Sequence, residues 1–227
     1  MFMDIDIALL EMLNGSNSSF IDALMLVLTS GYTWIALYVA LFYLVVNNSE
    51  TMLQIMVIVG CAVLCAILSG GVCDYIIKPL AGRLRPINDP ALCDIVVSVG
   101  GLGAKDFSFF SSHAANTVSI TVFFSLLVRN MKLFVTLSFW ALTNCFSRIY
   151  LGMHYPSDVL VGILWGILIG FVVYYIHLKL YSHVSKGGGF ISTQYTSKGF
   201  AIFTVDIVIG VIISIYIVSI LMALILA

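Results

Sequence analysis

The sequence predicts an all-α, polytopic membrane bundle of about six transmembrane helices, preceded by short interfacial helices and forming a single domain over residues 1–227. Two observations favour this fold class. Hydrophobic residues make up 61% of the chain and charged residues only 9%, and the mean hydropathy is +1.11. A soluble domain of 227 residues cannot bury so much apolar surface. The apolar residues also gather in runs near the roughly 20 residues that a helix needs to cross a bilayer.

The start of the chain predicts two short helices that lie in the membrane interface. Apolar residues recur there at helical spacing, at Ile5, Leu9, Leu10 and Leu13 and, after a break, at Phe20, Ala23, Leu24, Val27 and Leu28. Polar residues stand between them, which favours the interface over a span. Residues 1–14 contain acidic residues but no Lys or Arg, so they lack the basic start of a signal peptide and we do not expect cleavage.

Six apolar segments follow, and each is predicted to cross the membrane once. They cover residues 32–46, 51–77, 113–128, 133–150, 159–178 and 200–227. Between the second and third segments, Ala81–Ser112 is predicted to be one external loop, and a loop of this length is usually functional. Gly187–Gly189 is predicted to be a flexible cytoplasmic linker.

The distribution of Lys and Arg predicts which loops are cytoplasmic. Arg129 and Lys132 flank the turn between the third and fourth segments. Lys179, Lys186 and Lys198 belong to the loop between the fifth and sixth segments. With six spans these two loops share one side of the membrane, and their positive charge makes that side cytoplasmic. Both ends of the chain and the external loop then lie on the outside.

Three polar clusters interrupt this apolar chain. They are Lys78 with Arg83 and Arg85, then Ser111, Ser112 and His113, and then Ser147 and Arg148 followed by His154 and Asp158. Ionisable residues are costly inside or beside a bilayer, so clusters of them indicate chemistry. The predicted topology places all three clusters on the external face.

The residue types in these clusters suit a phosphate group. Four cations belong to them: Lys78, Arg83, Arg85 and Arg148. A guanidinium binds planar oxyanions through two bonds, and an ammonium acts as a point charge. Each cation alone could be an interfacial anchor, but four together favour a binding pocket. Ser111 and Ser112 begin the third segment, where free backbone N–H groups and the helix dipole offer an anion site.

The histidines add the groups that a phosphoryl transfer needs. His113, in the first turn of the third segment, can donate a proton to an oxygen leaving group. Asp158 could hold one imidazole nitrogen of His154 and leave the other as a nucleophile. We therefore predict transfer of a phosphoryl group to His154, with the cations stabilising its equatorial oxygens. The metal-ligand sets of a two-metal phosphatase are not visible, so the reaction is predicted to need neither a metal nor another cofactor.

Other features of the sequence limit the partners of the chain. The formal net charge is −1 and no basic stripe is present, which excludes nucleic acid as a partner. Cys73 and Cys93 could approach each other near one membrane face, but we do not expect a disulfide. Gly162, Gly166 and Gly170 permit close helix contact, and we expect this contact inside the monomer, so that no oligomer is required.

These residues resemble the signature of the type 2 phosphatidic acid phosphatases, membrane relatives of acid phosphatases and vanadium haloperoxidases. The signature has three parts, KxxxxxxRP, PSGH and SRxxxxxHxxxD. The first is complete from Lys78 to Pro86 and the third from Ser147 to Asp158. The second departs from the pattern at Phe110 and Ser112, where the family has Pro and Gly. The resemblance covers the second to fifth segments.

The resemblance implies a single membrane-embedded phosphatase domain with its signature region at residues 78–158. His154 would form a phosphohistidine, Asp158 would orient it, and His113 would protonate the leaving group. The phosphate would be bound by Lys78, Arg85, Arg148, Ser111 and the backbone N–H of Ser112, with Arg83 and Ser147 as further candidates.

The resemblance leaves the substrate open among bacterial membrane lipids. The enzyme is expected in the inner membrane with its site facing the periplasm, acting on the 1- or 4′-phosphate of lipid A or on undecaprenyl pyrophosphate. Phosphatidylglycerol phosphate is an alternative, and so is transfer of the phosphoryl group to a second lipid. A scaffold or transporter that merely kept the motifs is disfavoured because both His113 and His154 are present.

Overall fold

The computed structural model describes residues 2–16, 18–101, 107–182 and 194–227, and most of these residues are helical. Their only extended pairing is an isolated antiparallel bridge between Tyr195 and Ala201. Lys186 and the predicted linker Gly187–Gly189 lie outside the described residues, so the linker stays a prediction.

Helices occupy each segment that the sequence predicts to be helical. They are α1 (Phe2–Leu13), α2 (Ser19–Thr29), α3 (Ile35–Asn47), α4 (Met52–Ala66), α5 (Lys78–Ala81), α6 (Ser112–Val128), α7 (Met131–Tyr150), α8 (Pro156–Tyr181) and α9 (Ile202–Leu226). A 3₁₀ turn at Gly31–Trp34 joins α2 to α3, and two π-helical stretches, Ile67–Gly71 and Cys73–Ile77, join α4 to α5. The loop that the sequence predicts to be external contains short 3₁₀ turns at Pro86–Asn88, Pro90–Leu92 and Val99–Gly101.

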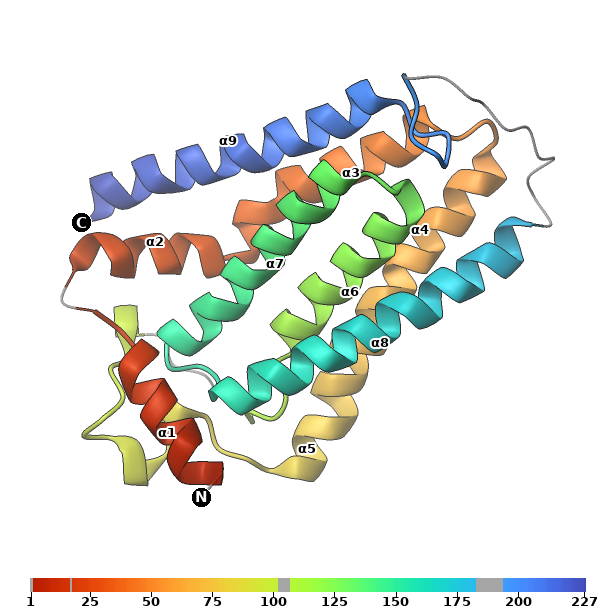
Figure 1. Ribbon diagram of the computed structural model, residues 1–227. Coiled ribbons are helices and arrows are strands. Elements are labelled where there is room, and N and C mark those ends of the chain that lie inside the picture. Colours follow the sequence, from red (N-terminus) through yellow and green to blue (C-terminus); the bar gives the residue numbers. More distant parts are fainter. Residues whose placement is uncertain (1, 17, 102–106, 183–193) are drawn as a thin grey trace.

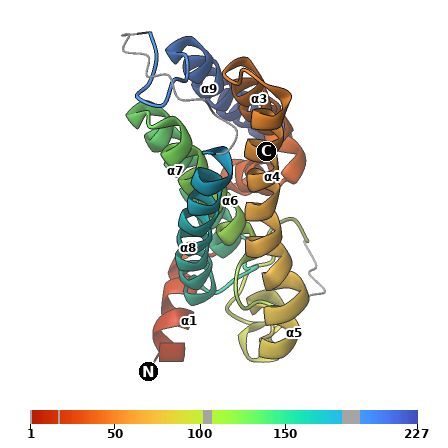
Figure 2. The same ribbon diagram turned by 90° about the vertical axis from the view of Figure 1, so that its right-hand side faces the viewer.

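The helices form one bundle with a distinct polar end. In Figures 1 and 2, α1 and α5 lie at the lower end, and the turn between α6 and α7 lies away from them. Figure 1 shows α9 running along α2 and α3 on one side, with α8 on the other. The described parts of the connection between α5 and α6 lie at the same end of the bundle as α1 (Figure 1). The first turn of α6, the last turn of α7 and the first turn of α8 lie at this end too.

A stripe of glycines brings α8 against α6. A Cβ atom at Gly162 would lie 2.6 Å from the carbonyl oxygen of Ser111, and one at Gly166 would lie 2.6 Å from that of Ala115. At Gly170 it would lie 2.6 Å from the Cβ of Val122. Only glycine allows this approach, so the prediction that the stripe packs inside the monomer is confirmed.

An aromatic core fixes the other side of the bundle. Trp34 and Trp140 are both buried, and their ring centroids lie 5.8 Å apart in an edge-to-face arrangement. The indole Nε1 of Trp34 donates a hydrogen bond to the carbonyl oxygen of Leu28, at 2.8 Å. This bond secures the bend between α2 and α3, whose axes differ by 62°.

The chain is a multi-pass membrane protein. Among the described residues, three stretches are long and apolar enough to span a membrane, namely Met52–Leu92, α8 and α9. The bent pair of α2 and α3 becomes a fourth if it counts as one broken span, and α6 is apolar but has only 17 residues. The structure contains the helices of all six predicted segments, and the count of six spans stays a prediction.

Candidate active site

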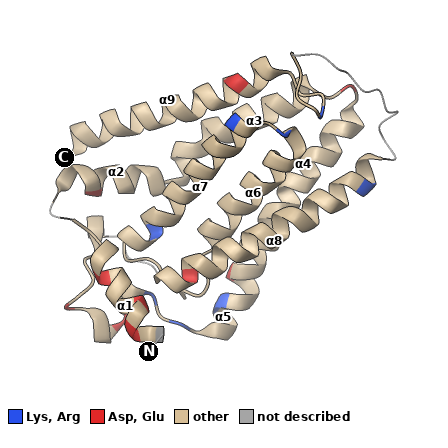
Figure 3. Cartoon of the chain, in the orientation of Figure 1, with Lys and Arg blue, Asp and Glu red and all other residues tan. Residues whose placement is uncertain are grey.

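Four segments meet at the polar end of the bundle and carry the predicted site residues. They are the end of α5 with the loop that follows, the start of α6, the end of α7, and the turn into α8. Figure 3 shows charged residues on α1, α5 and the start of α8 gathered at this end. The backbone N–H of Ser111 donates to the carbonyl oxygen of Asp158 at 3.1 Å, which ties α6 to α8. The side chain of Ser111 caps α6 as predicted, accepting from the N–H of Ala114 at 3.4 Å.

His154 is buried at the centre of the site, with 1% of its surface exposed. It lies in the turn before α8, which begins at Pro156. Nη1 of Arg85 donates to its Nε2 at 3.3 Å, and the hydroxyl of Ser108 lies 3.3 Å from its Nδ1. Because the guanidinium can only donate, Nε2 is the accepting nitrogen and the ring proton is on Nδ1.

Asp158 reaches His154 through Ser108. The distance from Nδ1 of His154 to Oδ2 of Asp158 is 4.0 Å, which is too long for a hydrogen bond. The hydroxyl of Ser108 fills this space and donates a short hydrogen bond to the same carboxylate oxygen. The ring proton of His154 therefore faces a serine oxygen that is itself oriented by the carboxylate, a relay that replaces the predicted direct contact.

The carboxylate of Asp158 is held away from His154 by the start of α8. The backbone N–H of Tyr155 donates to its Oδ2 at 3.3 Å, and Nη1 of Arg83 donates to its Oδ1 at 2.6 Å. Both bonds fix the carboxylate at the N-terminus of α8, where the helix dipole also favours negative charge. Ser108 is then needed to span the remaining distance.

Three cationic side chains, those of Lys78, Arg85 and Arg148, lie near the imidazole of His154. Nζ of Lys78, which is 5% exposed, lies 2.6 Å from Oδ1 of Asp74 and 3.3 Å from the hydroxyl of Ser112. The Ser112 hydroxyl, present where the family signature has glycine, therefore gains a cationic donor.

Arg148 has one buried donor with no hydrogen-bond partner among the described residues, its Nε. The side chain is buried, and its Nη1 donates to the hydroxyl of Thr29 at 2.5 Å. Nη1 of Arg85 also donates to the carbonyl oxygen of Met153, at 3.2 Å. A buried donor without a partner beside two further cations is suited to an oxyanion.

The electrostatic environment keeps His154 neutral. Its pKa lies well below 6.5, first because burial disfavours the charged ring and then because Arg85, Arg148, Lys78 and His113 add positive charge nearby. His113 is exposed on the first turn of α6. The four groups that influence His154 come from all three sequence clusters, so the structure brings the clusters together as predicted. A neutral imidazole at pH 7 retains the lone pair that a nucleophile requires.

Arg83 and Ser147, the two further candidates, contact protein groups beside the site. Arg83 donates to Asp158 and, through Nη2, to Oδ2 of Asp6 at 2.8 Å, and its guanidinium lies 3.7 Å from the ring centroid of Tyr155. The hydroxyl of Ser147 is buried and donates to the carbonyl oxygen of Asn144 at 2.8 Å. These contacts favour a positioning role over direct contact with phosphate.

The structure adds site residues that the sequence did not single out, namely Asp6, Thr29, Asp74 and Ser108. Asp74 carried a signal, since it lies one helical turn before Lys78 and the two form an ion pair at 2.6 Å. Thr29 and Asp6 lie far from the signature in sequence, and Ser108 lies in an irregular loop.

No group of three or more metal-ligating side chains is present in the part of the chain that the structure describes. The positive charge near His154 comes from Lys78, Arg85 and Arg148, and the metal-free reaction stays a prediction. Cys73 is buried and Cys93 is exposed, and both are free thiols.

Comparison with known proteins gives one consistent family. The PAP2 superfamily pattern matches residues 59–182. A lipid A 4′-phosphatase of Bacteroides thetaiotaomicron is 33% identical over 199 residues, which is 84% of this chain and 88% of the relative. A lipid A 4′-phosphatase of Porphyromonas gingivalis is 29% identical over 168 residues, 73% of this chain and 70% of the relative.

Two further matches share the fold or a part of the sequence. The undecaprenyl-diphosphatase BcrC of Bacillus subtilis is 39% identical over 71 residues, 31% of this chain and 36% of the relative. The crystal structure of a transmembrane PAP2-type phosphatidylglycerolphosphate phosphatase from Bacillus subtilis matches with a TM-score of 0.58 and 19% identity. That match covers 78% of this chain and 87% of the other, and it supports the fold.

Proposed function

We propose that this protein removes the 4′-phosphate of lipid A. The chain belongs to the PAP2 superfamily and is a phosphoric monoester hydrolase. One observation carries the reaction: a buried, neutral His154 lies against Arg85 and within the influence of Lys78 and Arg148. The substrate is proposed from the similarity to lipid A 4′-phosphatases over most of the chain, including regions beyond the signature.

The proposed reaction gives each nitrogen of His154 a role. Nε2 attacks the phosphorus atom, the bond from phosphorus to the sugar oxygen breaks, and that oxygen takes a proton from His113. The ring of His154 becomes cationic and keeps its Nδ1 proton on Ser108. Water then attacks phosphorus, His113 takes a proton from this water, and the phosphorus–nitrogen bond breaks to release inorganic phosphate and neutral His154.

The cations and the start of α6 would stabilise the transferred group. Lys78, Arg85 and Arg148 supply positive charge, and Ser111 and Ser112 stand where the first N–H groups of α6 are free. Charge on the three equatorial oxygens grows in the transition state, so preorganised donors at these positions lower the barrier.

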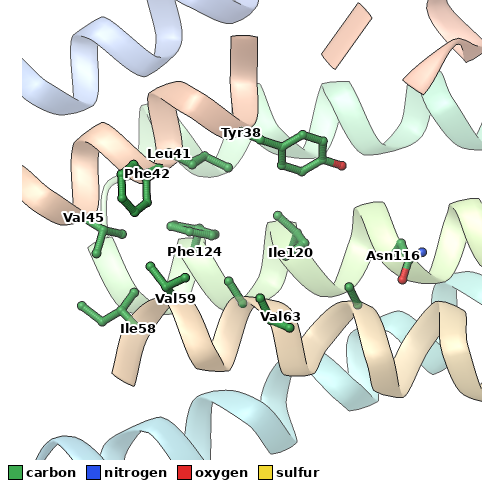
Figure 4. A pocket seen from close by; sticks show the side chains of 12 residues that line it. Tyr38, Leu41, Phe42, Val45, Ile58, Val59, Val63, Asn116, Ile120 and Phe124 are labelled. Atoms are coloured by element: carbon green, nitrogen blue, oxygen red, sulfur yellow. The ribbon is translucent and has the colours of Figure 1, made fainter. Parts of the chain in front are cut away.

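An apolar groove beside the site supports a lipid substrate. It has a volume of about 370 Å³ and lies between α3, α4 and α6, with Tyr38 and Asn116 among its lining residues. Figure 4 shows side chains of the three helices facing this space, with Asn116 at one end of the row along α6. Asn116 follows His113 by one helical turn, so the groove begins near the candidate proton donor and suits one acyl chain.

Charge distribution supports a site on the outer face of the inner membrane. Arg129 and Lys132 lie at the turn between α6 and α7, and Lys179 lies in the last turn of α8. The turn between α6 and α7 and the last turn of α8 lie at the end of the bundle away from α1 and α5 (Figure 1). With the basic end cytoplasmic, His154 faces the periplasm.

Phosphate release by the purified protein in detergent tests the substrate. Lipid A carrying both phosphates, undecaprenyl pyrophosphate and phosphatidylglycerol phosphate are supplied in parallel, with His154→Ala as the inactive control. We expect release from lipid A and a product that mass spectrometry identifies as having lost the 4′-phosphate. Preferred release from undecaprenyl pyrophosphate would favour the second candidate, which the match to an undecaprenyl-diphosphatase supports, and would overturn the assignment to lipid A.

The same assay separates a hydrolase from a lipid-to-lipid phosphotransferase. Because a phosphohistidine can pass its phosphoryl group to any well-placed hydroxyl, unlabelled acceptor lipid is added with radiolabelled lipid A. Label recovered in inorganic phosphate supports hydrolysis. Label recovered in the acceptor lipid would replace hydrolysis with transfer.

A further inference from the structure

Asp6 on α1 is a buried carboxylate at the rear of the catalytic site. Only 6% of its surface is exposed, although α1 was expected to lie at the membrane interface. Its Oδ1 accepts from the backbone N–H of Ser157 at 2.8 Å, and its Oδ2 accepts from the hydroxyl of Ser157 at 2.5 Å. Nη2 of Arg83 donates to the same Oδ2 at 2.8 Å. A buried charge with three donors is held firmly in place.

Arg83 connects Asp6 to Asp158. While Nη2 contacts Asp6, Nη1 lies 2.6 Å from Oδ1 of Asp158 and 2.9 Å from the hydroxyl of Ser157. The guanidinium also stacks on the ring of Tyr155, with 3.7 Å from Cζ to the ring centroid. The guanidinium is planar, and its two terminal nitrogens donate to different carboxylates. The position of Asp6 therefore sets the position of Nη1, which donates to Asp158.

The other oxygen of Asp158 continues the connection to His154. Oδ2 accepts from Ser108, whose hydroxyl faces Nδ1 of His154. An unbroken series of contacts therefore runs from Asp6 through Arg83, Asp158 and Ser108 to the nucleophile.

The charge of Asp6 also matters for the reaction. Arg83 and the two carboxylates together carry a net charge of −1, which favours the cationic ring of a phosphorylated His154. Without the charge of Asp6, the sum is zero and Arg83 is free to turn wholly onto Asp158. The stabilisation of the cationic ring would then fall, while the groups that contact the phosphate would be unchanged.

We propose that Asp6 is a positioning residue for phosphoryl transfer, acting through Arg83 and Asp158 on His154. This inference rests on the proposed function. It adds a residue outside the signature to the catalytic apparatus and gives α1 a role in the reaction.

The test compares Asp6→Asn with Glu11→Gln, which removes an exposed carboxylate from the same helix. Steady-state phosphate release is measured per folded protein, with folding checked by gel filtration and thermal unfolding. For Asp6→Asn we expect kcat to fall on the order of 10-fold, as for loss of an outer partner of an oriented histidine, with KM unchanged. Glu11→Gln should match wild type. A wild-type kcat for Asp6→Asn, or an equal fall in Glu11→Gln, would overturn the inference.

A double-mutant cycle tests the route through Arg83. If Asp6 acts through this guanidinium, Asp6→Asn should have no further effect on kcat in an Arg83→Gln background. Multiplicative effects of the two substitutions would contradict that route. Asp6→Glu keeps the negative charge and should retain a higher kcat than Asp6→Asn. A lower kcat for Asp6→Glu than for Asp6→Asn would indicate a purely steric role and overturn the inference.

The outcomes distinguish this inference from the proposed function. If His154→Ala remains active, the proposed mechanism fails. If His154→Ala is inactive and Asp6→Asn equals wild type, the proposed function stands and only the role of Asp6 fails.

Discussion

Replacing Ser108 with alanine should slow phosphoryl transfer without weakening substrate binding. Ser108 is the only described side chain that bridges Nδ1 of His154 and Oδ2 of Asp158, which lie 4.0 Å apart. Alanine removes the acceptor for the ring proton and the donor to the carboxylate. A hydrogen bond to a charged group contributes about 1.5–3 kcal/mol, so kcat should fall about 10- to 150-fold.

The assay is stopped-flow phosphate release at saturating lipid, with KM measured in parallel. Ser214→Ala is the matched control, since Ser214 is exposed on α9 and its hydroxyl donates to the carbonyl oxygen of Gly210 in its own helix. It should behave as wild type. A Ser108→Ala enzyme within about twofold of wild-type kcat would refute the reasoning, because a loss of about 0.4 kcal/mol is less than one hydrogen bond contributes. Asp158 would then contact His154 directly in the working enzyme.

Three other predictions concern the nucleophile, the helix contact and the source of charge. The ring-nitrogen NMR signals of His154 can be assigned by comparison with His154→Ala. They should stay those of neutral imidazole as the pH falls through 6.5, because burial and the nearby cations lower the pKa of His154. Protonation of His154 at or above pH 6.5 would contradict this. Gly166→Ala should lower stability to thermal unfolding by about 1–3 kcal/mol, since its Cβ would meet the carbonyl oxygen of Ala115 at 2.6 Å. Gly60→Ala, with no atom near its Cβ, should not destabilise the protein, and equal losses would argue against the close contact. EDTA should leave the rate unchanged, because Lys and Arg side chains supply the positive charge, and strong inhibition would contradict the metal-free mechanism.

The helices and the polar clusters could be predicted because both follow from the cost of polarity in a membrane. Long apolar runs have few alternatives to a helix, since every backbone polar group must be satisfied internally. For the same reason, Lys78, Arg85 and Arg148 stood out as charges that required a function.

The contacts between the clusters depend on the fold and could not be predicted. His154 and Asp158 are four apart, which suggested direct contact, but α8 begins at Pro156 and leaves His154 in the preceding turn. The helical spacing rule therefore does not apply to this pair, and Ser108 intervenes. Nothing distinguishes Ser108 from other loop serines in the sequence.

The contacts of α1 could not be predicted for a different reason. Its acidic and apolar residues gave the pattern of an interfacial helix, and Asp6 belonged to its polar set. The structure shows Asp6 facing Arg83 and Ser157, contacts between residues that are 77 and 151 positions apart. A pattern within one helix does not identify such distant partners.

Trapping the phosphorylated enzyme tests the central claim most directly. Protein is mixed with lipid A radiolabelled at the 4′-phosphate, quenched in alkali during a single turnover, digested, and examined for labelled peptides by mass spectrometry. The proposed mechanism predicts label on the imidazole of His154 and none in His154→Ala. Phosphate release without any labelled protein, or label on another residue, would contradict it.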